Sequence, residues 1–238
     1  MSLLNGLSTQ IETIFDEYPY RFFTEHDIHS ELARIATESL KKEGSLYAET
    51  SDHYKIGRLH HEYPTPFRCL MDHYNFRMIT EDEFKLERRK KKFNAKRGRI
   101  DLVVLNSDYI SSNTLRIVSG KRYEDLLVSV KQQKHPALDL AIEVVYHPAL
   151  DEKPHVGIME GRAKSTLQDY MKLVELMKFK YPTGVTFCKQ AAMFFFSNTT
   201  HKKTLSAMFD SFPHDARVDL FKVLHNVPNQ LNGSISTR

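Results

Sequence analysis

The chain has 238 residues, of which 41% are hydrophobic and 27% charged, with nine Gly and nine Pro. This is the composition of an ordinary globular protein, and it excludes collagen-like and disordered chains. The length fits one large domain, or one domain with a small appendage. The longest apolar run, residues 191–196, is far shorter than the roughly 20 residues that span a bilayer. The two cysteines make no disulfide framework, so we expect a cytoplasmic protein without a membrane span.

The positive charge is concentrated in one segment. The formal net charge is +4, but residues 85–99 (KLERRKKKFNAKRGR) contain nine basic residues and one acidic residue, a net charge of +8. This leaves 25 basic and 29 acidic residues, or −4, for the rest of the chain. Such a cluster on a mildly acidic body favours contact with the phosphates of nucleic acid. The alternative is a solvated loop whose charge serves solubility.

The first part of the chain predicts helices and then a strand. Residues 1–23 form an N-terminal helical extension, with an amphipathic stretch from Leu7 to Phe15. Thr24, three residues before Asp27, is typical of a helix start, and we expect a helix from there to about Lys42. A strand is predicted over 57–63 (GRLHHEY), closed by two prolines. Residues 67–83 favour helical or irregular structure.

The second part predicts the sheet core. Residues 99–105 (RIDLVVL) predict a strand, residues 107–130 an insertion, and residues 138–146 (LDLAIEVVY) a central strand that is buried on both faces. Apolar spacing from Lys164 to about Lys180 predicts an amphipathic helix. The segments that follow predict buried strands over 185–188 and 191–196, small helices over 204–209 and 218–224, and a loose tail over 229–238. The order is helix, strand, strand, strand, helix, strand, which predicts one α/β domain over residues 24–200, with a mixed central sheet flanked by helices and a C-terminal segment over 201–238.

Two acids lie inside strands that are otherwise apolar, Asp101 and Glu143. An unpaired carboxylate in a low-dielectric core costs several kcal/mol, so each needs a compensating partner. One possibility is an ion pair, since Arg99 lies two residues from Asp101 on the same strand face. The other is that the two strands are neighbours and aim both carboxylates at one hard cation, because two carboxylates plus waters suffice for Mg²⁺.

The strand pair RGRIDLVVL and LDLAIEVV, preceded by an acidic helix and followed by a helix and a buried strand, resembles the PD-(D/E)XK, or restriction-endonuclease-like, nuclease superfamily. The resemblance covers roughly residues 24–197 and implies the α-β-β-β-α-β core of that family. It also implies that Asp101 and Glu143, with the backbone carbonyl of Val144 as a further ligand, bind Mg²⁺, with Mn²⁺ as an alternative. The implied activity is the hydrolysis of DNA phosphodiester bonds.

One position departs from the family pattern. The family's lysine stands two residues after the glutamate, and this chain has Val145 there. Valine can neither orient water nor neutralise a phosphoryl oxygen. Either another lysine has taken the role, with Lys164 preferred over Lys131, or other groups replace it, or the protein is a catalytically inactive nuclease-fold module that binds DNA or a partner.

The acid on the first helix is assigned to Glu31, which lies on the flank of the apolar stripe, with Glu25 and Asp27 as competitors for the same role. The alternative for Glu31 is a solvated acid. For Glu62, a surface pair with a basic residue is preferred.

The DNA contacts are assigned to the basic segment, and the oligomeric state stays open, with a homodimer as one option. A zinc site is not favoured, because the histidines and the cysteine between residues 53 and 73 lack the paired spacing of four ligands. The residues expected to bind the nucleic-acid backbone are Arg88, Arg89, Lys90, Lys91, Lys92, Lys96, Arg97 and Arg99.

Overall fold

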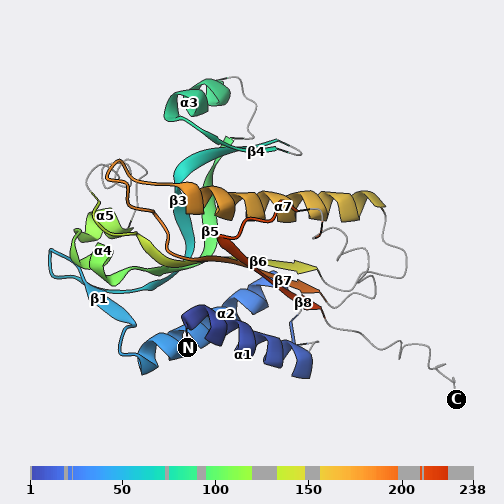
Figure 1. Ribbon diagram of the computed structural model, residues 1–238, viewed down its shortest axis with the longest axis horizontal. Coiled ribbons are helices and arrows are strands. Elements are labelled where there is room, and N and C mark those ends of the chain that lie inside the picture. The colour runs from blue at the N-terminus through green and yellow to red at the C-terminus, as the bar shows by residue number, and fades with distance from the viewer. Residues whose placement is uncertain are drawn as a thin grey trace, which may run out of the picture.

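The computed structural model (Figure 1) describes residues 2–18, 21–22, 24–72, 75–89, 95–119, 133–147, 156–197, 210 and 212–224. The helices in these ranges are α1 (Leu3–Glu17), α2 (Glu25–Lys42), α3 (Glu81–Arg89), α4 (Ser107–Ser111), α5 (Leu115–Ser119) and α7 (Val156–Lys178). The strands are β1 (Tyr47–Glu49), β2 (Lys55–Gly57), β3 (Leu59–Asp72), β4 (Asn75–Ile79), β5 (Ala95–Leu105), β6 (Leu138–His147), β7 (Ala191–Ser197) and β8 (Val218–Leu224).

A six-stranded mixed sheet forms the centre of the molecule, with the strand order β4-β3-β5-β6-β7-β8. The pairs from β4 to β6 are antiparallel, whereas β6, β7 and β8 are parallel. Strands β1 and β2 form a separate hairpin. The predicted α/β class with a mixed central sheet is therefore confirmed. In chain order, α2 is followed by β3, β5, β6, α7 and β7, with β4 and α3 between β3 and β5 and with α4 and α5 between β5 and β6.

Helices cover both faces of the sheet, with α7 on one face and α1 and α2 on the other (Figure 1). The core below α7 contains Val103 and Val145, and the core above α1 and α2 contains Leu102 and Val144. Alternate residues of β5 and β6 thus face opposite layers. The prediction that residues 138–146 form a strand buried on both faces is confirmed.

Helix α2 begins where the sequence predicted. The Thr24 side chain accepts a hydrogen bond from the Asp27 N–H, and the Asp27 carboxylate accepts one from the Thr24 N–H. This reciprocal cap satisfies two N–H groups that a helix start leaves without intrahelical partners. The helix ends at Lys42, and Gly44 follows with a φ of 65°, which glycine adopts without strain.

Several predicted elements differ from those in the structure. Residues 67–83 continue β3 and then form β4 and the start of α3. The prolines at 64 and 66 do not close β3, because the register with β5 shifts between Pro64 and Arg68, where a missing N–H costs no ladder hydrogen bond. Residues 218–224 form a strand beside β7 rather than a helix. Residues 185–188 make only isolated bridges, and the helix expected over 204–209 lies outside the described residues.

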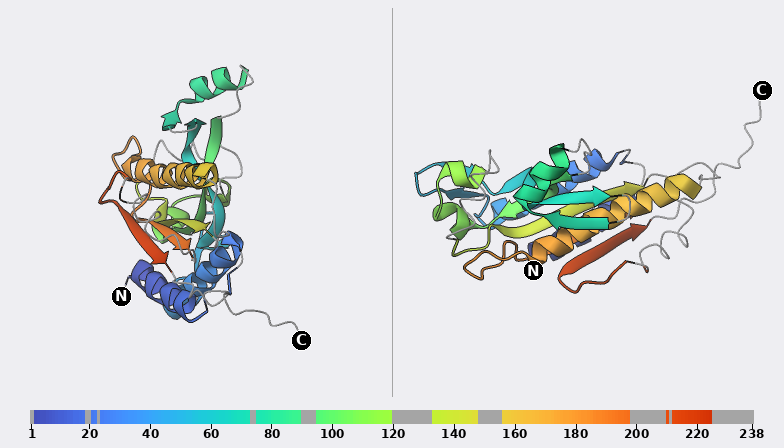
Figure 2. Two further views of the ribbon diagram at one scale, coloured as in Figure 1. Left: turned by 90° about the vertical axis from the view of Figure 1, so that its right-hand side faces the viewer. Right: turned by 90° about the horizontal axis from the view of Figure 1, so that it is seen from above.

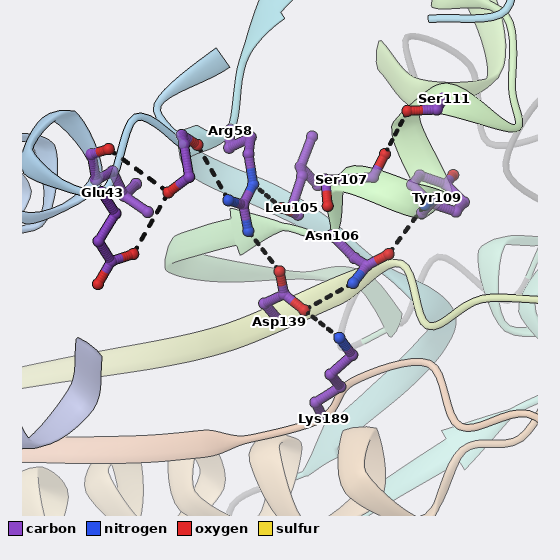
Figure 3. A network of polar contacts seen from close by, with 11 residues as sticks. Glu43, Arg58, Leu105, Asn106, Ser107, Tyr109, Ser111, Asp139 and Lys189 are labelled. Carbon is purple, nitrogen blue, oxygen red and sulfur yellow. Dashed lines mark hydrogen bonds and ion pairs between the residues drawn. The ribbon is translucent and has the colours of Figure 1, made fainter. Parts of the chain in front are cut away.

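A polar network ties β5 and β6 together at one end of the sheet, which we call the closed end (Figure 3). The buried Arg58 donates to the carbonyl oxygens of Leu105 and Ser45 at 2.8 and 3.0 Å, and to the Asp139 carboxylate at 2.5 Å. Asp139 also accepts from the Asn106 amide at 2.8 Å and contacts the Lys189 amine at 2.7 Å. The Asp139 carboxylate is thereby compensated by two cations, which fixes where the two strands meet.

Within the part of the chain that the structure describes, no helix is both long and apolar enough to pass through a lipid bilayer.

Candidate functional site at a fork in the sheet

Strands β5 and β6 pair only over part of their lengths. Their last shared pair away from the closed end joins Leu102 to Ile142. Beyond it, the earlier part of β5 pairs with β3, and residues 143–147 of β6 pair with β7. Figures 1 and 2 show β3, β4 and β5 turning away from β6, β7 and β8 at this point. Asp101 and Glu143 are the first residues past the last pair, so both begin this opening, which we call the fork.

Two carboxylates replace the missing strand along the open edge of β6. The Val144 N–H donates to the Asp101 carboxylate at 2.8 Å, and the Tyr146 N–H donates to the Glu25 carboxylate at 3.2 Å. These bonds satisfy backbone donors that would otherwise face the fork without a partner. They also place the carboxylates of Glu25 and Asp101 along the open edge of β6. Glu25 comes from the first turn of α2, and Asp101 comes from β5.

Glu143 points to the other layer, where α7 supplies its partner. The Lys172 amine lies 2.8 Å from a Glu143 carboxylate oxygen and donates to Asp169 at 3.2 Å. Glu143 and Lys172 are only 2% and 5% exposed. A buried charge that loses its partner is strongly destabilising, so the three side chains must be treated as one unit.

The electrostatics of the fork are dominated by crowded carboxyl groups. Burial raises the pKa of Glu143 well above its ordinary value, the nearby Lys172 ammonium opposes this rise, and the Asp101 carboxylate adds to it. Burial also raises the pKa values of Glu25 and Asp169, and Asp101 again adds to both. Burial alone would lower the pKa of Lys172, but the carboxylates of Glu143 and Asp169 outweigh it and raise this pKa.

Glycine at position 98 lets β5 lie close to the Thr65 side chain of β3. A β-carbon on Gly98 would lie 2.8 Å from the Thr65 hydroxyl oxygen and 3.5 Å from the δ-carbon of Lys172. The first distance is a collision, and the Thr65 hydroxyl is held by hydrogen bonds to the carbonyls of Phe67 and Gly98. The close approach of β3 and β5 at this point therefore depends on glycine.

His29 reaches the fork from α2, one turn after Glu25. Its Nε2 atom is buried and lies 3.6 Å from an Asp101 carboxylate oxygen. Burial lowers the pKa of His29, Asp101 opposes that effect, and His61 and His26 add to it. Neutral imidazole is thus favoured beside a carboxylate, which leaves a ring nitrogen able to act as a ligand.

The structure places Asp101 and Glu143 just past the last shared pair of β5 and β6, and Asp101 accepts a hydrogen bond from the Val144 N–H. The amine at Glu143 belongs to Lys172, eight positions after Lys164 on α7, which is about 12 Å of helix. Lys131, the other lysine considered, lies outside the described residues. The Arg99–Asp101 ion pair, which was the alternative interpretation of Asp101, is not among the ion pairs of the described residues, and Arg99 lies 3.4 Å from Glu62 instead. That contact confirms the surface pair predicted for Glu62.

Glu31 lies away from the fork. Its buried carboxylate contacts Arg21 at 3.2 Å and Arg34 at 2.6 Å, so it is compensated by two guanidinium groups. Successive residues of a helix are rotated by about 100°, which turns Glu31 roughly 200° away from His29. Of the three acids considered on this helix, Glu25 reaches the fork, and Asp27 caps the helix.

The basic segment approaches the fork along β5. It begins in α3 and ends at Arg99, two residues before Asp101. Lys90, Lys91 and Lys92 lie outside the described residues, as do the side chains of Arg88, Arg89, Lys96 and Arg97. Arg99 is exposed on β5, and its ion pair with Glu62 leaves it at the surface.

The donor set at the fork suits a hard cation. Four electrostatically coupled carboxyl groups (Glu25, Asp101, Glu143 and Asp169) face one ammonium, that of Lys172. Carboxylate oxygens are the ligands that Mg²⁺ and Mn²⁺ prefer. In the described residues, no three His, Cys, Asp or Glu side chains come together as a metal-binding group, so a cation here would rely on two protein carboxylates, backbone oxygen and water, as Mg²⁺ commonly does.

Comparison with known proteins gives no match for this chain among family models, curated proteins or solved structures.

Several residues of the fork were not predicted from the sequence. Lys172 and Asp169 were passed over because lysines and aspartates on helices are usually solvated. A signal was present, since Lys172 stands between Met171 and Leu173 in a segment whose other residues are mainly apolar. His29 follows Glu25 by four residues, which places both on one helix face. That spacing was the available indication that they act at the same place.

Proposed function

We propose that this protein is a Mg²⁺-dependent nuclease with a restriction-endonuclease-like core, and that it cuts DNA phosphodiester bonds at the fork. The observation that carries the proposal is the contact of Lys172 with Glu143 beside Asp101. Lys172 supplies from helix α7 the amine that the strand lacks, because position 145 is occupied by valine.

The proposed metal ligands are Asp101, Glu143 and the carbonyl oxygen of Val144. In a strand, the N–H and C=O of one residue point to the same side. Because the Val144 N–H points to Asp101, its carbonyl oxygen also faces the fork. A bound Mg²⁺ would lower the pKa of a coordinated water and stabilise negative charge on the phosphate.

The side chains of the fork have separate tasks in this proposal. Lys172 places a permanent positive charge where a phosphoryl oxygen gains negative charge, because its neighbours raise its pKa. Asp169 holds the Lys172 amine from the same helix, at 3.2 Å. Glu25 and Asp101 hold the open edge of β6 in place through its N–H groups, so the Val144 carbonyl keeps its direction.

The basic segment supports DNA as the substrate. Nine basic residues precede Asp101 by two to sixteen positions in the chain, and β5 leads directly from one to the other. Phosphate contacts of this kind orient a duplex without reading its sequence. They would bring a backbone phosphate to the fork.

The proposal is tested by nicking of supercoiled plasmid DNA in Mg²⁺. Asp101→Asn and Lys172→Met are each expected to lower the nicking rate by about 100-fold or more, since each removes a charge that acts in the transition state. Asp108→Asn and Lys164→Met are matched controls, and both should keep the wild-type rate. Equal rates for Lys172→Met and wild type, with a folded variant, would contradict the role of Lys172.

A second function is favoured by Val145 and by the direct Glu143–Lys172 contact, which already compensates the buried carboxylate. It is a catalytically inactive nuclease-fold module that binds DNA. DNA binding by a folded wild-type protein that shows no nicking in Mg²⁺ or Mn²⁺ would support this second function and contradict the first.

A further inference from the structure

Glu62 has a backbone conformation that suits glycine better than glutamate. Its φ is 52°, in the left-handed region where a β-carbon crowds the backbone. On β5, the ladder pairs that flank it involve Ile100 and Leu102, so Glu62 lies across from Asp101, at the fork. Ile100 packs into the core below α7 and Leu102 into the core above α1 and α2. The sheet therefore bends at this point, and glycine would allow the bend without strain.

The side chain of Glu62 contacts the arginine that ends the basic segment. A Glu62 carboxylate oxygen lies 3.4 Å from the Arg99 guanidinium group, and the Glu62 and Arg99 side chains are 56% and 66% exposed. Ion pairs this exposed contribute little to stability, so the pair does not offset the strain at position 62. Non-glycine residues held at such φ values cluster at active sites and ligand-binding sites, which supports a role for the Glu62 side chain in binding.

Both members of this pair lie next to the fork. Arg99 precedes Asp101 by two positions on β5, about 7 Å along a strand. Burial lowers the pKa of His29, and the charges of Asp101 and Glu62 both oppose this effect, so the Glu62 carboxylate lies within electrostatic reach of the fork. A phosphate that approached Asp101 would therefore also approach Arg99, and it would meet the acid that is paired with Arg99.

We propose that Glu62 competes with DNA phosphate for Arg99, and that it thereby weakens DNA binding beside the fork unless a phosphate displaces it. This inference rests on the DNA binding of the proposed function and goes beyond it by assigning a residue that lowers the affinity.

The geometry of the pair makes this exchange favourable. The 3.4 Å contact between Glu62 and Arg99 is longer than a charge-assisted hydrogen bond, which measures about 2.7–2.9 Å. A phosphate can accept two parallel hydrogen bonds from one guanidinium group, so it is the stronger partner. DNA that lies elsewhere on the basic segment gains nothing from Arg99. An unfavourable charge placed in this way is a common source of discrimination between modes of binding.

Fluorescence anisotropy of the full chain with a labelled duplex tests this inference without depending on cleavage. At about 0.15 M salt the Debye length is about 8 Å, which limits repulsion between Glu62 and distant phosphates. Glu62→Gln keeps the size of the side chain and removes the competing charge, so it should bind DNA about two- to fivefold more tightly than wild type. In Arg99→Gln protein the same change should give a clearly smaller gain, because the pair is already lost.

Glu38→Gln is the matched control, since it alters another exposed glutamate that is paired with an arginine, Arg34 on α2. It should bind DNA as wild type does. Glu62→Gly is the second variant. It should bind DNA more tightly than wild type, and its urea midpoint should be higher than that of Glu62→Gln, because glycine adopts a φ of 52° freely.

The outcomes separate this inference from the proposed function. If wild type binds no DNA, the proposed function itself fails. If wild type binds DNA and Glu62→Gln binds it equally or more weakly, DNA binding stands and the role of Glu62 is overturned. Equal gains with and without Arg99 also overturn it, since the acid would then act on phosphate directly. A urea midpoint for Glu62→Gly that is no higher than that of Glu62→Gln would overturn the strain at position 62.

Discussion

Glu143 is the residue on which the chemistry of the fork depends most. Its carboxylate is almost completely buried, and the compensating Lys172 amine comes from another element at 2.8 Å. Breaking such a pair by removing one partner costs about 3–5 kcal/mol.

Replacing Glu143 by Gln should change the pH dependence of stability. The pKa of Glu143 is raised above its ordinary value of 4.5 in the folded state, so the folded state keeps its proton after the unfolded state has released it. Stability then falls as the pH rises above about 4.5. Because Gln does not titrate, the free energy of unfolding of Glu143→Gln should increase relative to that of wild type as the pH rises above about 4.5.

Urea unfolding at several pH values measures this difference. Glu12→Gln, which alters an exposed glutamate on α1, provides the control and should not show the trend. A difference between Glu143→Gln and wild type that stays constant across the pH range would mean that the folded state does not raise the pKa of Glu143.

At the residue scale, the sequence predicted the acids better than their partners. Asp101 and Glu143 could be found from the sequence because each is an acid inside an otherwise apolar strand segment. The Lys172 contact depends on where α7 crosses the sheet, and the Glu25 contact depends on where β5 and β6 part. Local residue spacing encodes neither the place where α7 crosses the sheet nor the place where β5 and β6 part. The sequence therefore favoured Lys164 for the amine and Glu31 for the acid of the helix.

At the scale of elements, the closed end determines where the fork opens. Arg58 joins the end of β5 to the start of β6 through contacts with Leu105 and Asp139 (Figure 3). Only a guanidinium group can make its three contacts at once, because it carries several donors in a fixed planar arrangement.

Arg58→Lys should therefore be destabilising although the charge is kept. Losing two of the three hydrogen bonds at a mostly buried site is expected to lower the free energy of unfolding by about 2 kcal/mol. Chemical denaturation measures this loss. Arg217→Lys, which alters an exposed arginine paired with Asp215, is the control and should leave the denaturation midpoint unchanged. A wild-type midpoint for Arg58→Lys would show that the closed end does not depend on this side chain.

Helices with strong start signals were predicted well, and short apolar segments were not. The Thr24–Asp27 cap gave the start of α2 because its chemistry is local. Residues 218–224 satisfy both a helical and a strand period over seven positions, and the free edge of β7 decided the outcome. In β3, the prolines predicted the end of the strand. The strand continues past them, and its register against β5 shifts between Pro64 and Arg68.

On the scale of the whole molecule, the fork lies at the base of an arm. The arm consists of β4, α3 and the adjoining parts of β3 and β5, and it stands away from the helices that cover the sheet (Figure 2). The guanidinium group of Arg68 lies 3.7 Å from the centre of the Phe84 ring, a cation–π contact that packs α3 against β3. The described parts of the basic segment, in α3 and β5, belong to this arm, and in the proposed function a duplex would contact both the arm and the fork.

Under the proposed function, neutralising part of the basic segment should weaken DNA binding in a salt-dependent way. Replacing Lys90, Lys91 and Lys92 by Gln is expected to reduce the slope of log affinity against log salt by up to about 2.7, at about 0.9 for each lost phosphate contact. Fluorescence anisotropy with a labelled duplex at several salt concentrations gives both slopes. The triple variant at the exposed Lys41, Lys42 and Lys134 removes the same charge elsewhere and should keep the wild-type slope. Equal slopes for both triple variants would remove the basic segment from the DNA interface.

The central claim is that the Asp101 and Glu143 carboxylates act together in metal-dependent DNA cleavage. The most direct measurement is the rate of plasmid nicking by purified Asp101→Asn/Glu143→Gln protein, compared with wild type in Mg²⁺ or Mn²⁺ and in EDTA. The account predicts that wild type nicks only with the metal, and that the folded double variant nicks no faster than wild type in EDTA. Metal-dependent nicking by the double variant at the wild-type rate would contradict it.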